Sequence, residues 1–153
     1  MIVTFFGHGD FIYCQEDEQR ALALLEEYVG NTPCDFYLGE YGGFDRFAYH
    51  CAKRFKRKHP RVQLIFVTPY PLDSECKEKN QDLIARFDLV LYPPLENVPP
   101  RYAISHRNRW MVDQASLVIT YVCHRWGGAY TAYRYALQRK KDVCNLACYK
   151  MPI

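Results

Sequence analysis

The sequence lacks the features that would place it in a specialised class at once. No apolar run approaches the roughly 20 residues that a membrane-spanning helix needs, and no repeat, linker or low-complexity segment is present. The net charge is only +3 and the isoelectric point about 8.4, whereas nucleic-acid-binding domains usually exceed about 9. With 153 residues, 49% of them apolar, the chain predicts one soluble domain over residues 1–153, without a membrane contact.

Cysteine is present, but in no pattern that predicts disulfides or a metal site. The seven cysteines are an odd number, with no CxxC pair and no secretory signal. A zinc site built from Cys123, His124, Cys144 and Cys148 would match no standard spacing, and the histidines form no HxxxH pair. We therefore expect free thiols in the cytoplasm, no metal and no cofactor.

Strand-like and helix-like patterns alternate along the whole chain. Runs rich in β-forming apolar residues predict strands at 2–6, 34–39, 62–70, 89–94, 116–123 and 142–146. Amphipathic patterns predict helices between them. Strands separated by helices form βαβ units, which assemble into a parallel sheet covered on both faces. The expected fold is α/β, a three-layer doubly wound Rossmann-like fold with a mainly parallel sheet.

The helical patterns also predict caps and buried faces. Ser105 is the expected N-cap of a helix that ends near Ala115, and Asp73 or Ser74 is the expected N-cap of an earlier one. The helix at 16–29 is expected to bury Ala21, Leu24, Leu25, Tyr28 and Val29, and the next helix a stripe from Phe44 to Phe55. The last two buried faces are expected at Cys76, Leu83, Ile84 and Phe87, and at Ala129, Ala132, Tyr133, Ala136 and Leu137.

Four segments that follow predicted strands are chemically unusual: GHGD (7–10), GEYGGFD (39–45), SHRNRWMVD (105–113) and HRWGGAYT (124–131). In a doubly wound sheet, ligands bind beyond the carboxyl ends of the strands, where the strand order reverses. Glycines let the backbone approach a ligand closely, which makes candidates of Gly7 with His8, Gly42 with Gly43, and Gly127 with Gly128. The alternative for each glycine pair is a simple turn, and Ile12 replaces the third glycine of a dinucleotide fingerprint.

Arg107, Asn108 and Arg109 open a predicted helix, where the helix dipole disfavours cations. This placement suggests a use in binding an anion, with one arginine and Asn108 beside the buried stripe and the other arginine pointing outward. The alternative is a solvated helix end whose arginine stems cover apolar surface. Asp113 is expected either to pair with Arg109 or to orient a ligand hydroxyl.

The chain resembles the SLOG superfamily, which joins DNA-processing protein A to the Lonely Guy phosphoribohydrolases, and within it the YpsA-like branch. The matching elements, over about residues 2–146, are TFFGH, GGFDRFAYHCA, LIFVTPY, RNRWMVDQASLVITYV and GGAYTAYRYA. The resemblance implies a nucleotide pocket with Gly42, Gly43 and Asp45 on one side and Gly127, Gly128 and Thr131 on the other, where Arg107 and Asn108 meet the ligand. It also implies a possible homodimer.

Two residues depart from the family pattern. Gly9 stands where the related branch has an arginine, and Arg134 occupies the position of the Lonely Guy catalytic glutamate, whose chemistry a cation cannot perform. The leading hypothesis is therefore a cytoplasmic protein that binds a nucleotide or a nucleotide-derived molecule such as an ADP-ribose-like ligand.

Two alternatives stay open, and with them the question of whether the protein is an enzyme. An N-glycosidic-bond hydrolase acting on a nucleoside monophosphate would need a carboxylate, for which the candidates are Glu40, Asp45 and Asp113. A single-stranded nucleic-acid-binding module, the less favoured partner class, would use the basic residues Lys53, Arg54, Lys56, Arg57 and Lys58.

Overall fold

The computed structural model describes residues 1–72 and 77–149 and contains a six-stranded sheet. The strands are β1 (Ile2–Gly7), β2 (Cys34–Leu38), β3 (Val62–Val67), β4 (Leu89–Leu91), β5 (Leu117–Tyr121) and β6 (Asp142–Asn145). All neighbouring strands are parallel, which confirms the predicted α/β fold. The order β4-β3-β2-β1-β5-β6 reverses between β1 and β5, as in a doubly wound sheet.

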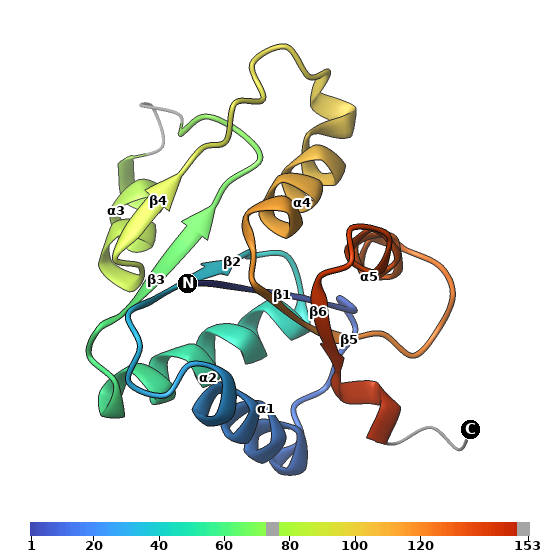
Figure 1. Cartoon of the computed structure of the whole chain (residues 1–153). Helices are drawn as coiled ribbons and strands as arrows, with labels where there is room; N and C mark the ends of the chain where they lie inside the picture. Colours follow the sequence, from blue (N-terminus) through green and yellow to red (C-terminus); the bar gives the residue numbers. More distant parts are fainter. Residues whose placement is uncertain (73–76, 150–153) are drawn as a thin grey trace.

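Helices cover both faces of the sheet and form the outer layers of the sandwich (Figure 1). They are α1 (Gln15–Tyr28), α2 (Gly43–Lys58), α3 (Lys77–Arg86), α4 (Ala103–Gln114) and α5 (Gly128–Gln138), with short 3-10 helices η1 (Pro100–Tyr102) and η2 (Leu146–Tyr149). Buried side chains of α1, α2 and α3 form one hydrophobic cluster against the sheet, and those of α4 and α5 form another. No helix in the described part of the chain is long and apolar enough to cross a membrane.

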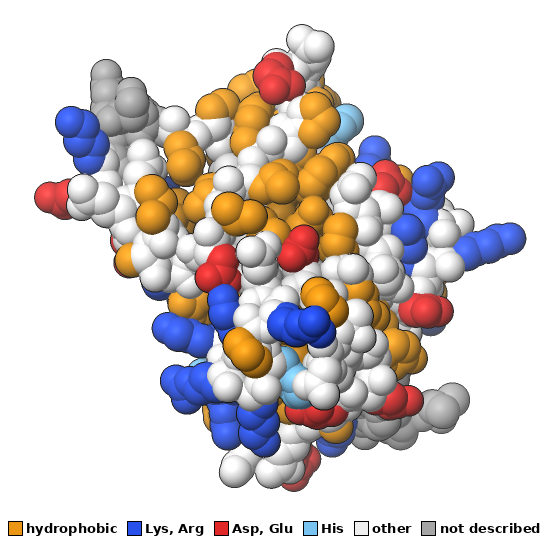
Figure 2. Space-filling view, turned by 60° about the vertical axis from the view of Figure 1, so that its left-hand side comes forward, with side chains coloured by type: hydrophobic (Ala, Val, Ile, Leu, Met, Phe, Trp, Pro, Cys, Tyr) orange, Lys and Arg blue, Asp and Glu red, His pale blue; other side chains and the backbone are white. Residues whose placement is uncertain are grey.

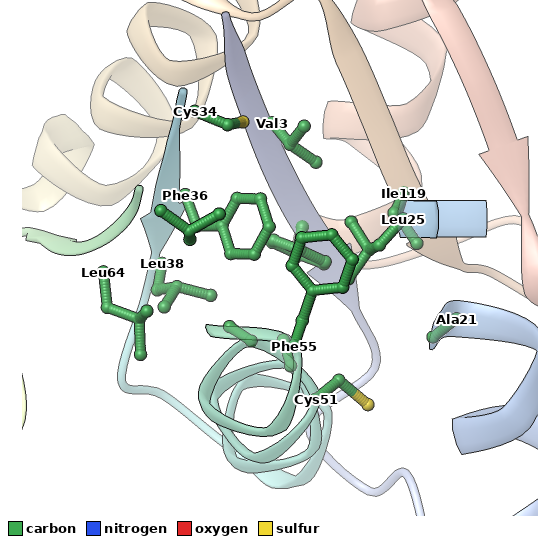
Figure 3. Packing of buried hydrophobic residues seen from close by; sticks show 14 of the residues in the cluster. Val3, Ala21, Leu25, Cys34, Phe36, Leu38, Cys51, Phe55, Leu64 and Ile119 are labelled. Atoms are coloured by element: carbon green, nitrogen blue, oxygen red, sulfur yellow. The ribbon is translucent and has the colours of Figure 1, made fainter. Parts of the chain in front are cut away.

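The larger core lies between α2 and the neighbouring strands. Six buried side chains confirm the predicted apolar stripe of α2: Phe44, Phe47, Ala48, Cys51, Ala52 and Phe55. Phe55 packs on Phe36 of β2, with ring centres 5.8 Å apart (Figure 3). Burial of each such ring contributes roughly 1.5–3 kcal/mol. This layer therefore fixes α2, and with it the turn that connects β2 to α2.

The predicted face of α3 is correct at two positions and wrong at a third. Leu83 and Phe87 are buried, four residues apart, whereas Ile84 is 64% exposed. One residue turns a helix by roughly 100°, which places Ile84 on the outer side. Figure 2, turned toward the side of α3 and β4, shows hydrophobic side chains exposed over this part of the molecule. The expected N-cap at Asp73 or Ser74, and Cys76, lie outside the described residues.

The predicted face of α5 is too wide. Ala132 and Ala136 are buried, whereas Leu137 is 46% exposed and Ala129 and Tyr133 are half-buried. Two alanines four residues apart let α5 lie close to α4 and the sheet, so only a narrow stripe is covered. The predicted face of α1 is also too wide. Ala21, Leu25 and Val29 are buried, while Leu24 is half-buried and Tyr28 is 39% exposed.

Ser105 is not the N-cap of α4. The Tyr102 N–H donates to the carbonyl of Pro99 at 2.8 Å and closes η1, which passes directly into α4 at Ala103. The helix therefore starts three residues earlier than predicted, with Tyr102 as its N-cap, and Ser105 lies in its first turn. Because of this shift, Ser105 lies within a regular helix and does not cap its start.

Candidate ligand-binding site

The reversal of strand order places the loops after β1 and β5 side by side. His8 follows β1 and is buried, and its Nε2 accepts a hydrogen bond from the Cys123 backbone N–H at 3.0 Å. His8 stacks on His124 with ring centres 3.6 Å apart, and His124 stacks on Trp126 at 3.7 Å. This stack connects the two loops and has Trp126 as its exposed end, with 68% of its surface open.

The contact with Cys123 fixes the state of His8. A ring nitrogen that accepts a hydrogen bond carries no proton, so the proton of the neutral ring sits on Nδ1. Burial lowers the pKa of His8 below its ordinary value, the neighbouring His124 lowers it further, and Asp10 opposes both effects. His8 thus joins β1 to β5 as a neutral side chain.

The Gly42–Gly43 pair is packed against the loop after β1. The Gly43 N–H donates to the Gly9 carbonyl at 2.8 Å. A Cβ on Gly42 would lie 2.6 Å from Cα of Gly9, and one on Gly43 would lie 2.2 Å from the carbonyl oxygen of Phe11. Gly42 also has a φ of 118°, which side chains rarely tolerate. Close backbone packing therefore accounts for both glycines, while their role in ligand binding stays a prediction.

Gly7 is likewise accounted for by packing, because a Cβ there would overlap the ring of Phe44 at 2.1 Å. Gly7 thus lets α2 approach the end of β1.

Arg107, on α4, is buried against the end of β3. Its side chain is 4% exposed, and its Nη1 donates to the Val67 carbonyl at the end of β3 at 3.0 Å. Its Nε and Nη2 donate to Oδ1 of Asn108 at 3.1 and 2.9 Å. Because Arg107 occupies this oxygen, the amide Nδ2 of Asn108 is left as a donor. Of the two arginines considered for the inner face of α4, Arg107 is the buried one and Arg109 the exposed one.

Asp45 lies near Arg107 at the start of α2. It accepts the Tyr41 backbone N–H at 2.7 Å, and both Asp45 and Arg107 adjoin the position that a Cβ on Gly39 would take. Burial raises the pKa of Asp45 above its ordinary value, although the Tyr41 N–H and Arg107 oppose this. Burial also lowers the pKa of the Arg107 guanidinium, which Asp45 opposes. Asp45 on α2 and Arg107 on α4 are thus close enough for each charge to influence the pKa of the other.

A pocket of about 290 Å³ lies between α4 and the first turn of α5. We call it the α4–α5 pocket. It is lined by the backbone of Gly128 and by the polar side chains of Arg101, Ser105, Asn108, Arg109 and Thr131. The structure thus brings together three of the predicted residues: Asn108, Gly128 and Thr131. The other predicted residues lie beyond its lining: Gly7, His8, Gly42, Gly43, Asp45, Arg107 and Gly127.

Sequence patterns missed Arg101 and Ser105 as pocket residues. Arg101 follows a proline-rich loop that has no periodicity, and Ser105 looked like a cap. The continuation of η1 into α4 is what brings both to the pocket.

The start of α5 is open. Gly127 has a φ of 91°, and no described side chain caps the helix. A Cβ on Gly127 or Gly128 would have no atom within 4 Å. Gly128 lacks the positive φ that would require glycine, so neither packing nor backbone conformation accounts for it. The first backbone N–H groups of a helix have no partner within the helix, and here they adjoin the α4–α5 pocket.

The predicted pair between Asp113 and Arg109 is absent from the described contacts. Asp113 instead pairs with Arg139 at 3.1 Å and accepts the Tyr135 hydroxyl at 2.9 Å. The guanidinium of Arg109 lies 5.8 Å from the centre of the Tyr135 ring. Packing of α5 beside α4 supplies Asp113 with a partner from another helix and leaves Arg109 at the pocket.

Among the described residues, no group of three potential ligands converges on a point where a metal would bind. Cys14, Cys34, Cys51, Cys123 and Cys144 are free thiols.

The sequence matches no family model and no curated protein. Among solved structures, the chain superposes on DNA processing protein A from Helicobacter pylori with a TM-score of 0.64 and 20% identity. The protein of that name from Streptococcus pneumoniae gives 0.59 and 18%. The chain thus has the same kind of fold as DNA processing protein A. At this level of sequence identity the similarity shows a shared fold and no more.

These superpositions cover 94% and 92% of the chain, which spans 63% and 48% of the two larger proteins. A third structure, TM1055, gives a TM-score of 0.53 with 10% identity, over 93% of this chain and 71% of that one.

Proposed function

We propose that the protein binds a nucleotide or a nucleotide-derived ligand through its phosphate in the α4–α5 pocket. The observation that carries the proposal is Gly128. A glycine at the start of a helix costs stability relative to alanine, and nothing in the packing or the backbone accounts for this one. A phosphate approaching the backbone N–H groups of α5 gives it a reason, because any side chain there would stand in the way.

The charges around the pocket support an anionic ligand. Within the described part of the chain, neither Arg101 nor Arg109 has a carboxylate within 4.0 Å, whereas Arg20, Arg54 and Arg86 each do. An arginine without a carboxylate partner is available for a charge-assisted bond to phosphate. The Nδ2 of Asn108, oriented by Arg107, adds a neutral donor. In this proposal Arg107 positions Asn108 and does not itself contact the ligand.

The hydrolase alternative is less favoured by the positions of its candidate carboxylates. Glu40 pairs with Arg86, Asp113 pairs with Arg139, and Asp45 accepts the backbone N–H of Tyr41. No described carboxylate lines the α4–α5 pocket. A reaction at a ribose would need one nearby.

A second candidate function is binding of single-stranded DNA, which the H. pylori protein of the same fold performs. The basic run at 53–58 supports it only weakly. Arg54 pairs with Glu18 and Lys56 pairs with Asp88, so part of its charge is neutralised.

Membership of the YpsA-like branch, a homodimer and a cytoplasmic location belong to the same proposal. The first two rest on the sequence resemblance, and the third rests on the pattern of unpaired cysteines. The exposed apolar side chains of Ile84 on α3 and Leu89 on β4 offer a surface for a second copy.

The test is a thermal-shift panel of nucleoside monophosphates, NAD, ADP-ribose and oligo-dT, followed by calorimetry on any compound that binds. A ligand at 100 times its Kd adds about 2.7 kcal/mol, which raises the Tm of a protein of this size by about 5–10 °C. Gly128→Val should weaken binding of the active compound at least tenfold, because its branched side chain covers the N–H groups of α5.

Gln138→Val is the matched control, since it places the same side chain at the exposed end of the same helix. It should bind like the natural protein. The proposal is wrong if Gly128→Val binds with unchanged affinity, or if no small molecule in the panel shifts the Tm. A shift with oligo-dT alone would favour the second candidate function.

A further inference from the structure

A second pocket lies on the opposite side of α5. It has a volume of about 440 Å³ and is lined by residues after β5, by Asn145 of β6 and by the outer face of α5. We call it the rear pocket, and its side chains with recognisable chemistry are His124, Arg125, Tyr130, Tyr133 and Arg134. His124, Arg125 and Tyr130 belong to the segment HRWGGAYT (124–131) that the sequence singled out, whereas Tyr133 and Arg134 lie beyond it.

The rear pocket has the charge of an anion site. Arg125 and Arg134 both line it, and no carboxylate is among its lining residues. Across the described residues, neither arginine has a carboxylate within 4.0 Å, although Arg139 on the same helix pairs with Asp113. Two exposed cations that converge on one hollow without a counter-charge repel each other unless an anion lies between them.

The two pockets share the first turns of α5 as a wall. Gly128 and Thr131 line the α4–α5 pocket, whereas Tyr130 and Arg134 line the rear pocket. The spacing of a helix puts these two pairs on different sides. Gly127 and Gly128 carry no side chain and have free space where one would be, so the backbone presents no barrier at the start of the helix. The first turn of α5, which carries the uncapped N–H groups, therefore borders both pockets.

The size and lining of the pockets suit two linked groups better than one. Ligand pockets for whole small molecules usually measure about 300–1,000 Å³. The α4–α5 pocket, at about 290 Å³, lies just below this range, and the rear pocket, at about 440 Å³, lies in its lower half. Tyr130 and Tyr133 offer flat rings in the rear pocket, and such rings pack well against a base or a sugar. Each pocket combines two arginines with space for one ring system.

We propose that the rear pocket is a second subsite and that the ligand is a dinucleotide, two nucleosides joined through phosphates. This inference rests on the proposed function. One half occupies the α4–α5 pocket and the other occupies the rear pocket, and the bridging phosphates lie over Gly127 and Gly128 at the N-terminus of α5. Arg134 then binds the phosphate of the second half. The residue that replaces a catalytic glutamate in the family pattern thus has a binding role.

The experiment compares mononucleotides with the dinucleotides built from them. The probes are AMP, GMP, diadenosine diphosphate and diguanosine diphosphate, each dinucleotide being two copies of its mononucleotide joined by a pyrophosphate. Calorimetry measures Kd for the natural protein, for Arg134→Gln and for Arg57→Gln. The last variant removes the same charge from an exposed position on α2 and serves as the control.

A dinucleotide should bind at least tenfold more tightly than its own mononucleotide, because the second half binds as an intramolecular event. Arg134→Gln should raise the Kd for the dinucleotide at least tenfold and change the Kd for the mononucleotide less than twofold. Arg57→Gln should change neither Kd. A dinucleotide that binds no better than its mononucleotide overturns the second subsite and leaves the proposed function standing. Equal losses for both ligands in Arg134→Gln overturn it as well. If no probe binds, the inference and the proposed function fail together.

Discussion

Replacing Gly128 with alanine tests whether this glycine is needed for the fold or for binding a ligand. The added Cβ has no atom within 4 Å, and the backbone at Gly128 is helical without a positive φ. Alanine is therefore accommodated without strain. It also restricts the unfolded chain, so Gly128→Ala should stabilise the protein by about 0.5–1 kcal/mol. At the same time the methyl group stands over the N–H groups of α5 and should weaken phosphate binding.

Urea denaturation followed by circular dichroism measures the first effect and calorimetry with the active nucleotide measures the second. For a chain of this length the gain corresponds to a rise in Tm of about 1–4 °C. Opposite signs in the two measurements are the expected result. A loss of stability of about 1 kcal/mol or more would show that Gly128 serves the fold, and the main support for the proposed site would be gone.

Two further predictions concern the loop after β1. Gly43→Ala should destabilise the protein by about 1–3 kcal/mol in the same urea assay, because its Cβ would lie 2.2 Å from the Phe11 carbonyl oxygen; an unchanged midpoint would refute this packing role. His8→Gln should flatten the dependence of stability on pH. Burial lowers the pKa of His8 from 6.5, so the unfolded state takes up this proton at a higher pH than the folded state. The stability that His8 contributes is therefore present above about pH 6.5 and is lost as the pH falls toward the folded pKa. Urea midpoints at pH 7.5 and 5.5 should differ more in the natural protein than in the variant, and equal differences would contradict the assignment.

Periodicity predicted the architecture because it reports burial directly. The stripe on α2 and the alternation of strands and helices follow from which positions are apolar, and both are found in the structure. The predicted buried faces of helices were wrong at positions where burial depends on whether a neighbouring element covers that side of the helix. Ile84 and Leu137 fit helical spacing, but the surface opposite them is solvent.

Polar residues were harder to place than apolar ones. The acidic start of α1 suits the helix dipole, and that reason alone would leave Glu18 at the surface. Glu18 is instead 2% exposed and bound by Tyr13, Arg54 and His50, and the Tyr13 hydroxyl, with Arg54, holds the pKa of its carboxyl below the ordinary value. The partners come from 5 to 36 residues away along the chain, a distance that no local pattern reports. Arg107 is similar, because its burial depends on the Val67 carbonyl at the end of β3.

The two glycine pairs show why the site could be located only in part. Gly42–Gly43 and Gly127–Gly128 are the same dipeptide at the same kind of junction, between a parallel strand and the helix that follows it. What distinguishes them is a third segment. The loop after β1 lies against Gly42–Gly43 and occupies the space that a Cβ would need, while no described residue does so at Gly127–Gly128. β1 lies between β2 and β5, so strand order alone does not distinguish the two pairs. The loop after β1 packs on Gly42–Gly43 and meets β5 through His8 and Cys123 without covering the start of α5. The path of this loop, which no local pattern in the sequence reports, decides which pair is open, and the open pair is the one to which we assign the ligand.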